Sequence, residues 1–320
     1  MWRPRVKRRT FKAEQAGLAV GAALASELGI SPEEARRLVE VGAVYVAGKR
    51  ARDAGARLGV GQVVTVVLEE AGTSSLAAHV PALALRVLFE DAEIIAVDKP
   101  AGINAQPSEG RVGESLVDRV SAYLGSEAGL VHRLDRETSG VTVFGKTARA
   151  TSALAAEFRE GQARKRYVAA TGPGLPERGT VDLPLSKDPS RPGRWRATRA
   201  ANGVPAETDF QTLHAGPEFC LVELWPRTGR THQLRAHLTA LGAPILGDSR
   251  YGGAKQAAGL AAPRCLLHAQ ALQLRHPRTG KPWLVEAPVP EDLRRFFLAA
   301  EVEPPSGPVA PVPGPVAGGT

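Results

Sequence analysis

A carboxylate enclosed by basic side chains is the first candidate for chemistry in this chain. Asp135 sits between two arginines in the run His-Arg-Leu-Asp-Arg-Glu-Thr-Ser-Gly, which spans residues 132–140. Neighbouring cations favour the charged form of a carboxyl group, so Asp135 should be ionised at neutral pH and able to act as a nucleophile or base. In an extended segment side chains alternate, so Arg133 and Asp135 should share one face. Residues 138–140 are expected to turn the chain into an apolar strand at 141–144.

The core triplet by itself also fits an exposed ion pair that contributes little. The complete nine-residue run, however, resembles the catalytic signature of the RluA family of pseudouridine synthases. The resemblance implies that Asp135 is the catalytic aspartate. It also implies an enzyme that isomerises uridine to pseudouridine in structured RNA, a reaction that requires no cofactor and no metal.

A second motif, Lys-Arg-Tyr-Val-Ala-Ala at residues 165–170, reads as a strand. Alternation places Lys165, Tyr167 and Ala169 on one face. A tyrosine in a strand is usually a packing residue, but this string is similar to the Lys-x-Tyr strand of the family. The similarity implies that Tyr167 stacks on the target uracil, which suits recognition of a base turned out of its helix.

A third motif spans residues 224–237, and its last eleven residues, 227–237, include three arginines and two histidines. The two histidines are five residues apart, which is poor spacing for a helical metal site, so we expect no metal here. The string resembles the family motif Thr-Gly-Arg-Thr-His-Gln-Ile-Arg-x-His. By that resemblance Arg235 pairs with the catalytic aspartate, as a permanently charged planar guanidinium can. Arg230 should lie nearby, facing RNA phosphate or the motif's own fold, and His232 and Gln233 should be structural.

Three further positions have expected roles. The strand and Lys-Pro-x-Gly turn at residues 94–103 resemble family strings that flank the cleft and position the catalytic loop. Asp248 follows a glycine and is expected to form an Asx-turn rather than act as a second catalytic carboxylate. Leu267 is expected in the apolar floor of the uracil pocket. Two roles remain open for Arg133. Its side chain could fill the space left by the flipped base, or it could be a second electrostatic partner of Asp135.

The composition points to a basic, globular, RNA-binding protein. The chain has 320 residues, a net charge of +8 and 43% hydrophobic residues, and a pI of about 9.8. A strongly basic balance favours a polyanionic partner. Two distant cysteines, Cys220 and Cys265, argue against a disulfide framework or a zinc site. No run reaches the ~18 apolar residues of a membrane span, and no secretory signal is evident at residues 1–12. We therefore expect a cytoplasmic monomer, although a transit peptide stays open.

The chain divides into five predicted segments by composition and pattern. Many short strands around few helices predict an α+β catalytic domain with a mostly antiparallel mixed sheet and flanking helices. Helices are expected at residues 114–124 and 148–162. The uncharged Pro/Gly-rich end is expected to be disordered. The segments are a basic leader at 1–12, a small α/β module at 13–70, a linker at 71–84, the catalytic domain at 85–298 and the disordered tail at 299–320.

The small module begins with a recognisable helix signal, because Ser31, Pro32 and Glu34 fit a capping box with proline at the first helical position. This helix should run through Leu38 and precede strands at 43–46 and 63–67. The module resembles the S-four-like RNA-binding domain, although Ala47 and Gln62 stand where the family usually has Asn and Asp. Five cations could form a phosphate-contacting face, or merely a solvated charged one. They are Arg36, Arg37, Lys49, Arg50 and Arg52.

The resemblance to an S-four-like module ahead of the catalytic domain implies large-subunit ribosomal RNA as the substrate. Transfer RNA remains an alternative. Two readings from other classes also stay open, a non-catalytic RNA-binding assembly factor and a glycosylase that uses Asp135 hydrolytically. The glycosylase reading normally needs a second carboxylate, for which only Glu137 and Asp248 are candidates.

Overall fold

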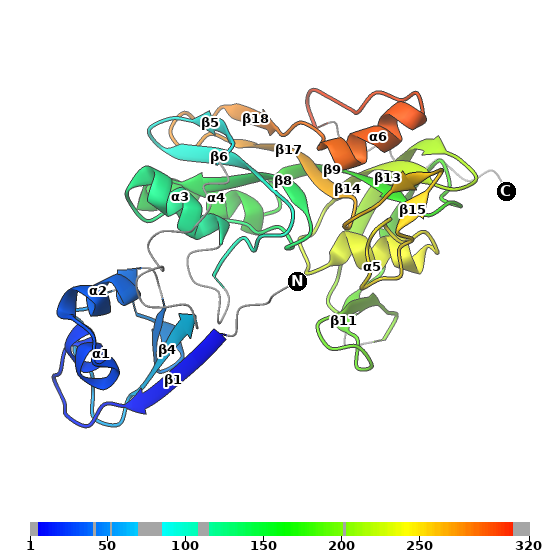
Figure 1. Ribbon diagram of the computed structural model, residues 1–320. Helices are drawn as coiled ribbons and strands as arrows, with labels where there is room; N and C mark the ends of the chain where they lie inside the picture. Colours follow the sequence, from blue (N-terminus) through cyan, green and yellow to red (C-terminus); the bar gives the residue numbers. More distant parts are fainter. Residues whose placement is uncertain are drawn as a thin grey trace. The chain divides into compact units, whose positions relative to one another are not determined.

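The computed structural model describes residues 6–40, 43–51, 53–69, 85–107, 115–200 and 203–309. The chain forms two compact units (Figure 1), one comprising Met1–Ala84 with Gln106–Ala122 and the other Leu85–Ala105 with Tyr123–Thr320. The predicted linker at 71–84 lies outside the described residues. No helix among the described segments is long and apolar enough to span a membrane.

Residues 6–69 of the first unit contain two helices and a four-stranded sheet of order β1-β4-β2-β3. The predicted capping box is confirmed, because Ser31 Oγ accepts from Glu34 N at 3.2 Å and Ser31 N donates to Glu34 Oε2 at 2.9 Å. The bounds are α1 Val20–Leu28, α2 Pro32–Glu40, β1 Val6–Lys12, β2 Val44–Val46, β3 Lys49–Arg50 and β4 Val63–Glu69.

The predicted basic leader is wrong for residues 6–12. These residues form β1, which pairs antiparallel with β4 from Val6–Glu69 to Lys12–Val63. The charge density suggested a solvated segment. A strand at the edge of a sheet, however, needs only one apolar face and is often protected by charged side chains.

The second unit is built on a ten-stranded sheet, and the predicted α+β class with a mostly antiparallel mixed sheet is confirmed. The order is β10-β13-β14-β9-β17-β8-β6-β5, with β18 beside β17 and β7 beside β8. The pairing of β8 with β17 is parallel and the other pairings are antiparallel. The strands are β5 Val87–Glu90, β6 Ile94–Lys99, β7 Gly129–Leu130, β8 Ser139–Gly145, β9 Arg164–Thr171, β10 Arg178–Asp182, β13 Glu207–Ala215, β14 Cys220–Pro226, β17 Leu267–Arg275 and β18 Pro282–Glu286.

Four further helices and two small hairpins complete the described chain, and the helix at 116–124 runs from the first unit into the second. The predicted helix at 148–162 ends earlier, at Arg159, and Gly161 follows with a φ of 72°. The helices are α3 Leu116–Leu124, α4 Ala148–Arg159, α5 Gln233–Ala240 and α6 Glu291–Ala299, and the hairpins are β11 Leu185–Lys187 with β12 Trp195–Ala197 and β15 Gln256–Ala257 with β16 Leu260–Ala261.

The two faces of the sheet are covered by different elements. Tyr167 pairs with Leu224 and Ala269 across the sheet, so these side chains share one face, and Arg166 lies on the other. Helices α4 and α5 pack on the Tyr167 face, whereas α6 covers the opposite one (Figure 1).

The predicted turn at residues 138–140 is displaced by two to three residues. The chain turns at Asp135–Thr138, where Thr138 N donates to Asp135 O at 3.1 Å, and residues 139–140 already belong to β8. Gly140 has a φ of 115°, and a Cβ there would collide with the carbonyl of Ala269 on β17. Glycine therefore serves the close approach of two parallel strands rather than the turn itself.

The predicted disordered tail is wrong for residues 299–309. The stretch after α6 crosses the Arg166 face of the sheet, where Arg166 Nη1 donates to Pro308 O at 3.4 Å and Gln270 Nε2 donates to Pro305 O. Val309 is 2% exposed and packs beside Trp225. Composition does not reveal that buried polar side chains elsewhere need the carbonyl groups of this segment. Residues 310–320 lie outside the described part of the chain.

Candidate active site

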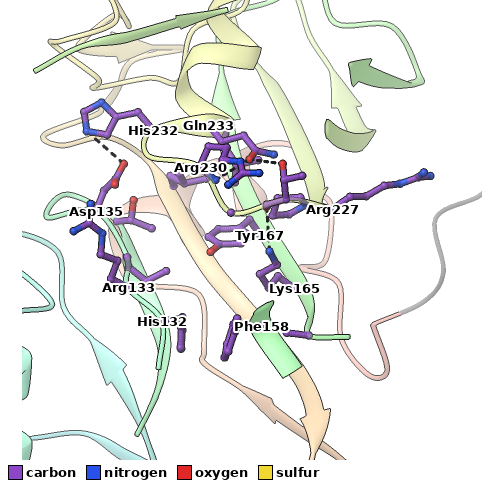
Figure 2. Close-up of a pocket in the computed structure, with 18 of the residues that line it drawn as sticks. His132, Arg133, Asp135, Phe158, Lys165, Tyr167, Arg227, Arg230, His232 and Gln233 are labelled. Atoms are coloured by element: carbon purple, nitrogen blue, oxygen red, sulfur yellow. Dashed lines mark hydrogen bonds and ion pairs between the residues drawn. The ribbon is translucent and has the colours of Figure 1, made fainter. Parts of the chain in front are cut away.

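A cavity of about 580 Å³ opens on the Tyr167 face of the sheet, between α4 and the N-terminal end of α5. Strand β9 contributes Lys165 and Tyr167 as the sequence predicted, because they are two residues apart on one face (Figure 2). Residues 131–135 form a second wall. The loop before α5 forms a third.

Asp135 lies at the start of the turn into β8, and its side chain is 24% exposed toward the cavity. The residue after it is clamped by the Lys-Pro-x-Gly turn. Gly102 N donates to Arg136 O at 2.8 Å, and Arg136 Nε donates to Gly102 O at 2.8 Å. The turn at the end of β6 thus holds the backbone next to Asp135.

Lys99, which sequence reasoning did not single out, is fully buried beneath this turn. Its Nζ donates to the carbonyls of Pro100, Ile103 and Arg136 at 3.0, 2.9 and 3.2 Å. Burial lowers the pKa of Lys99 to about 7, opposed by the charge of Asp135. A lysine at the end of a strand that begins with four apolar residues is the signal that could have identified it.

Arg235 contacts two carboxylates at once. Its Nη1 lies 3.2 Å from Asp135 Oδ2, and its Nε and Nη2 lie 2.7 and 2.9 Å from the oxygens of Asp248. Although burial opposes it, hydrogen bonding to Asp248 and that residue's charge raise the pKa of Arg235. The expected neighbourhood of Asp135 and Arg235 is therefore present in the structure.

Asp248 forms the expected Asx-turn, because its Oδ1 accepts from Arg250 N at 3.1 Å. The sequence did not indicate that the same carboxylate binds Arg235. Asp248 is 2% exposed, and it does not line the cavity. This places it behind Arg235 rather than beside a substrate.

Tyr167 projects into the cavity from the middle of β9 (Figure 2). Burial raises the pKa of its phenol, and the negative charge of Asp135 adds to this effect. The phenol is consequently neutral at physiological pH and able to donate a hydrogen bond. Leu267, 3% exposed, lines the cavity as expected.

The loop before α5 is ordered by Gln233. Its Oε1 accepts from Thr228 Oγ1 at 2.7 Å and from Arg230 N at 3.0 Å, and its Nε2 donates to Glu207 O at 2.9 Å. The structural role predicted for Gln233 fits these contacts. Arg230 is exposed and lines the cavity, and its Nε donates to Pro205 O at 3.0 Å.

His232 begins α5 with a φ of 55°, a left-handed conformation that is unusual for a residue with a side chain. Its Nδ1 lies 3.0 Å from Tyr251 Oη, and its Nε2 lies 3.8 Å from Asp135 Oδ2 (Figure 2). Burial lowers the pKa of His232, which keeps the ring neutral despite the opposing charge of Asp135. Sequence reasoning missed this approach to Asp135.

The remaining wall is aromatic. The rings of His132 and Phe158 stack with centroids 4.6 Å apart and an angle of 16°. His132 Nε2 accepts from Val143 N at 3.0 Å, and burial lowers the pKa of His132 to about 3. Arg133, next to it, is exposed at the cavity rim.

The cations predicted to contact RNA in the first unit are only partly described. Arg36 and Arg37 are exposed on α2, where Arg37 Nη2 lies 2.9 Å from Glu33 Oε1. Lys49 and Arg50 form β3, but nothing is described of their side chains, and Arg52 lies outside the described residues. In the described segments, no group of three or more His, Cys, Asp or Glu side chains is arranged to hold a metal ion.

Two family models match the chain. A model described as RNA pseudouridylate synthase matches residues 93–240, and an S4 domain model matches residues 23–64. The solved structure of human RNA pseudouridylate synthase domain containing 4 superposes with a TM-score of 0.57 at 27% identity, covering 69% of this chain and 95% of that one.

Curated relatives agree with these models. The chain is 41% identical over 210 residues to the dual-specificity RNA pseudouridine synthase RluA of Escherichia coli (strain K12), covering 64% of this chain and 93% of that protein. It is 35% identical over 228 residues to ribosomal large subunit pseudouridine synthase D of Nitrosomonas europaea, covering 68% of this chain and 66% of that protein. The chain therefore belongs to the RluA family of RNA pseudouridine synthases and includes an S4 RNA-binding domain.

Proposed function

We propose that this enzyme converts uridine to pseudouridine in large-subunit ribosomal RNA, with Asp135 as its catalytic residue. The observation that carries the proposal is the carboxylate of Asp135, which faces the cavity 3.2 Å from Arg235 Nη1. Among the residues that line this cavity Asp135 is the only acid. The name of the Nitrosomonas relative and the S4 domain support ribosomal RNA as the substrate.

The reaction breaks the bond between uracil N1 and the anomeric carbon of the sugar, rotates the base and joins it again through C5, which loses a proton. Asp135 can start it by attacking as a nucleophile or by removing a sugar proton to give a glycal. Either role requires the ionised carboxylate. The guanidinium of Arg235 orients this carboxylate toward the cavity.

Tyr167 stacks on the uracil in this proposal. A flipped base offers its flat face to an aromatic ring, which needs no particular sequence around it. The buried side chain of Leu267 supplies an apolar floor. Because the pKa of Tyr167 is raised, its phenol acts as a stacking surface and hydrogen-bond donor more readily than as a base.

Exposed arginines on the cavity rim stabilise the RNA around the flipped nucleotide. Flipping costs a few kcal/mol, which phosphate contacts by Arg133 and Arg230 help to offset. Arg36, Arg37, Lys49, Arg50 and Arg52 would extend phosphate contacts over the S4 domain. The two free, buried cysteines, Cys220 and Cys265, are consistent with a reducing, cytoplasmic location.

Tritium release from RNA labelled at C5 of uridine tests the proposal. We expect release from unmodified large-subunit ribosomal RNA by the wild-type protein and none by Asp135→Asn, with RNA affinity within severalfold of wild type. Release by Asp135→Asn would remove Asp135 from the mechanism. Release from bulk transfer RNA alone would overturn the substrate class while leaving the chemistry in place.

A further inference from the structure

Lys165 is a partly buried cation in the cavity that the proposed reaction does not use. It lies two positions before Tyr167 on the same face of β9, about 7 Å away along the strand. Figure 2 shows it beside Phe158, beyond Tyr167 as seen from Asp135. The cavity thus continues past the space between Asp135 and Tyr167 toward Lys165, Phe158 and Ala163.

Among the described residues the ammonium of Lys165 has one acceptor, the carbonyl of Thr228 at 3.1 Å. In the described part of the chain no carboxylate lies within ion-pair distance of it. Burial lowers the pKa of Lys165 to about 8. The imidazole of His132 carries no negative charge in either protonation state, so it provides no counter-ion. An ammonium carries three donors, so two donors of Lys165 remain for a ligand.

Two other cations that line the cavity, Arg235 and Arg227, are already paired with carboxylates. Arg235 is bound to Asp248 and Asp135. Arg227 lies 2.5 Å from Asp209 and 2.8 Å from Glu207. Lys165 differs from them because its partly buried charge has no carboxylate partner among the described residues, an arrangement that an anion arriving with the substrate would stabilise.

We propose that Lys165 binds a backbone phosphate next to the target uridine, so that the cavity holds a phosphate subsite beside its uracil subsite. This inference rests on the proposed function, because RNA must be the ligand that enters the cavity. A spacing of about 7 Å between the Tyr167 and Lys165 positions is on the scale of a single nucleotide. Lys165 is therefore a substrate-binding residue, and its ammonium fixes where the flipped nucleotide comes to rest.

The alternative is that Lys165 only holds the Thr228 turn. The salt dependence of RNA binding separates the two, because each phosphate contact contributes about −0.7 to −0.9 to the slope of log affinity against log salt concentration. The experiment measures the affinity for unmodified ribosomal RNA at salt concentrations from about 50 to 200 mM, an interval over which the loss of one phosphate contact changes the slope measurably. It uses Asp135→Asn as the background so that no turnover occurs.

Lys165→Met removes the charge but keeps most of the side-chain volume. We expect severalfold weaker binding and a slope smaller by about 0.7–0.9, whereas Lys165→Arg should retain most of the slope. Thr228→Val is the matched control, because it breaks the bonds from Thr228 Oγ1 to Gln233 and from Glu207 N without removing charge. It should leave the slope unchanged.

In the active background, Lys165→Met should raise KM more than it lowers kcat in the tritium assay. An unchanged salt slope in Lys165→Met, with thermal stability like that of wild type, would overturn the phosphate subsite. If Lys165→Met unfolds, Lys165→Gln provides the same comparison, and a wild-type slope in that variant would have the same meaning. If the wild-type protein releases no tritium, this result contradicts the proposed function, whatever the salt slopes show.

Discussion

Arg235 and Asp248 form a buried ion pair with two contacts, Nε to Oδ2 at 2.7 Å and Nη2 to Oδ1 at 2.9 Å. Both side chains are largely inaccessible, at 5% and 2% exposure for the whole residues. One edge of the guanidinium is thereby fixed, and only Nη1 remains for Asp135. Asp248, held in turn by the backbone N–H groups of Arg250 and Tyr251, sets the position from which Arg235 reaches Asp135.

Removing the charge of Asp248 should therefore affect both stability and catalysis. Breaking a buried pair typically costs about 3–5 kcal/mol, so we expect Asp248→Asn to lower the free energy of unfolding by up to this amount. The amide can keep the Asx-turn but not the ionic contact, so kcat for tritium release should fall as Arg235 loses its anchor. Denaturant unfolding and steady-state kinetics measure the two effects. Wild-type values of both would show that Asp248 does not position Arg235.

Tyr167 is expected to contribute mainly its ring. Tyr167→Ala should impair turnover strongly, because stacking on a base is worth roughly 1–3 kcal/mol. Tyr167→Phe keeps the ring, so it should bind RNA well but turn over more slowly than wild type. Tritium release and RNA binding, measured on both variants, separate the two contributions. Near-wild-type rates in both would rule out the stacking role.

The C-terminal stretch should stabilise the sheet that carries Tyr167. Ending the chain after Glu303 removes the carbonyls that accept from Arg166 and Gln270 and uncovers Trp225. Unsatisfied buried donors cost about 1–3 kcal/mol each, so the melting temperature should fall by several degrees. Ending the chain after Val309 is the control, because it keeps all of these contacts. Equal melting temperatures for the two truncations would contradict the structural role.

Stability should also fall with rising pH because of Glu223. Burial raises the pKa of Glu223 from 4.5 to about 7, and Arg166 at 3.8 Å opposes this only in part. The folded state therefore keeps a proton that the unfolded chain releases. The resulting stabilisation is present below pH 4.5 and is lost as pH rises through 7, on the order of 3 kcal/mol.

Glu223→Gln should remove this dependence. The free energy of unfolding of the variant, measured in urea, should therefore rise relative to that of wild type between pH 5 and 8. Glu177→Gln, whose parent side chain is 77% exposed, is the control and should follow the wild-type curve. A constant difference between wild type and Glu223→Gln over this range would mean that Glu223 does not titrate there.

The hairpin between β2 and β3 contains a residue whose replacement should stabilise the S4 domain. Ala47 and Gly48 have φ values of 49° and 76°, and an alanine in this region is strained. Ala47→Asn should raise the free energy of unfolding of the S4 domain by about 0.5–1 kcal/mol, because asparagine tolerates the left-handed region. Ala47→Val should lower it. Thermal melting of the three proteins tests the order, and a lower melting temperature for Asn than for Ala would contradict it.

The sequence by itself determined the reaction class, the fold class and the local elements that depend on neighbouring residues. The capping box at Ser31 and the face shared by Lys165 and Tyr167 follow from short-range periodicity. Charge density misled at residues 6–12, because a sheet edge accepts basic residues as readily as solvent does.

The tertiary structure decided every feature that depends on residues distant in the chain. The sequence indicated Asp248 as a turn residue, and only the fold brings its carboxylate to Arg235. Residues 304–309 look dispensable in composition, yet buried Arg166 and Gln270 bond to their carbonyls. Lys99 and Lys165 are both lysines in strands, but only the fold buries the first fully and places the second in the cavity. Burial and hydrogen-bond pairing are properties of three-dimensional neighbours, so spacing along one chain cannot specify them.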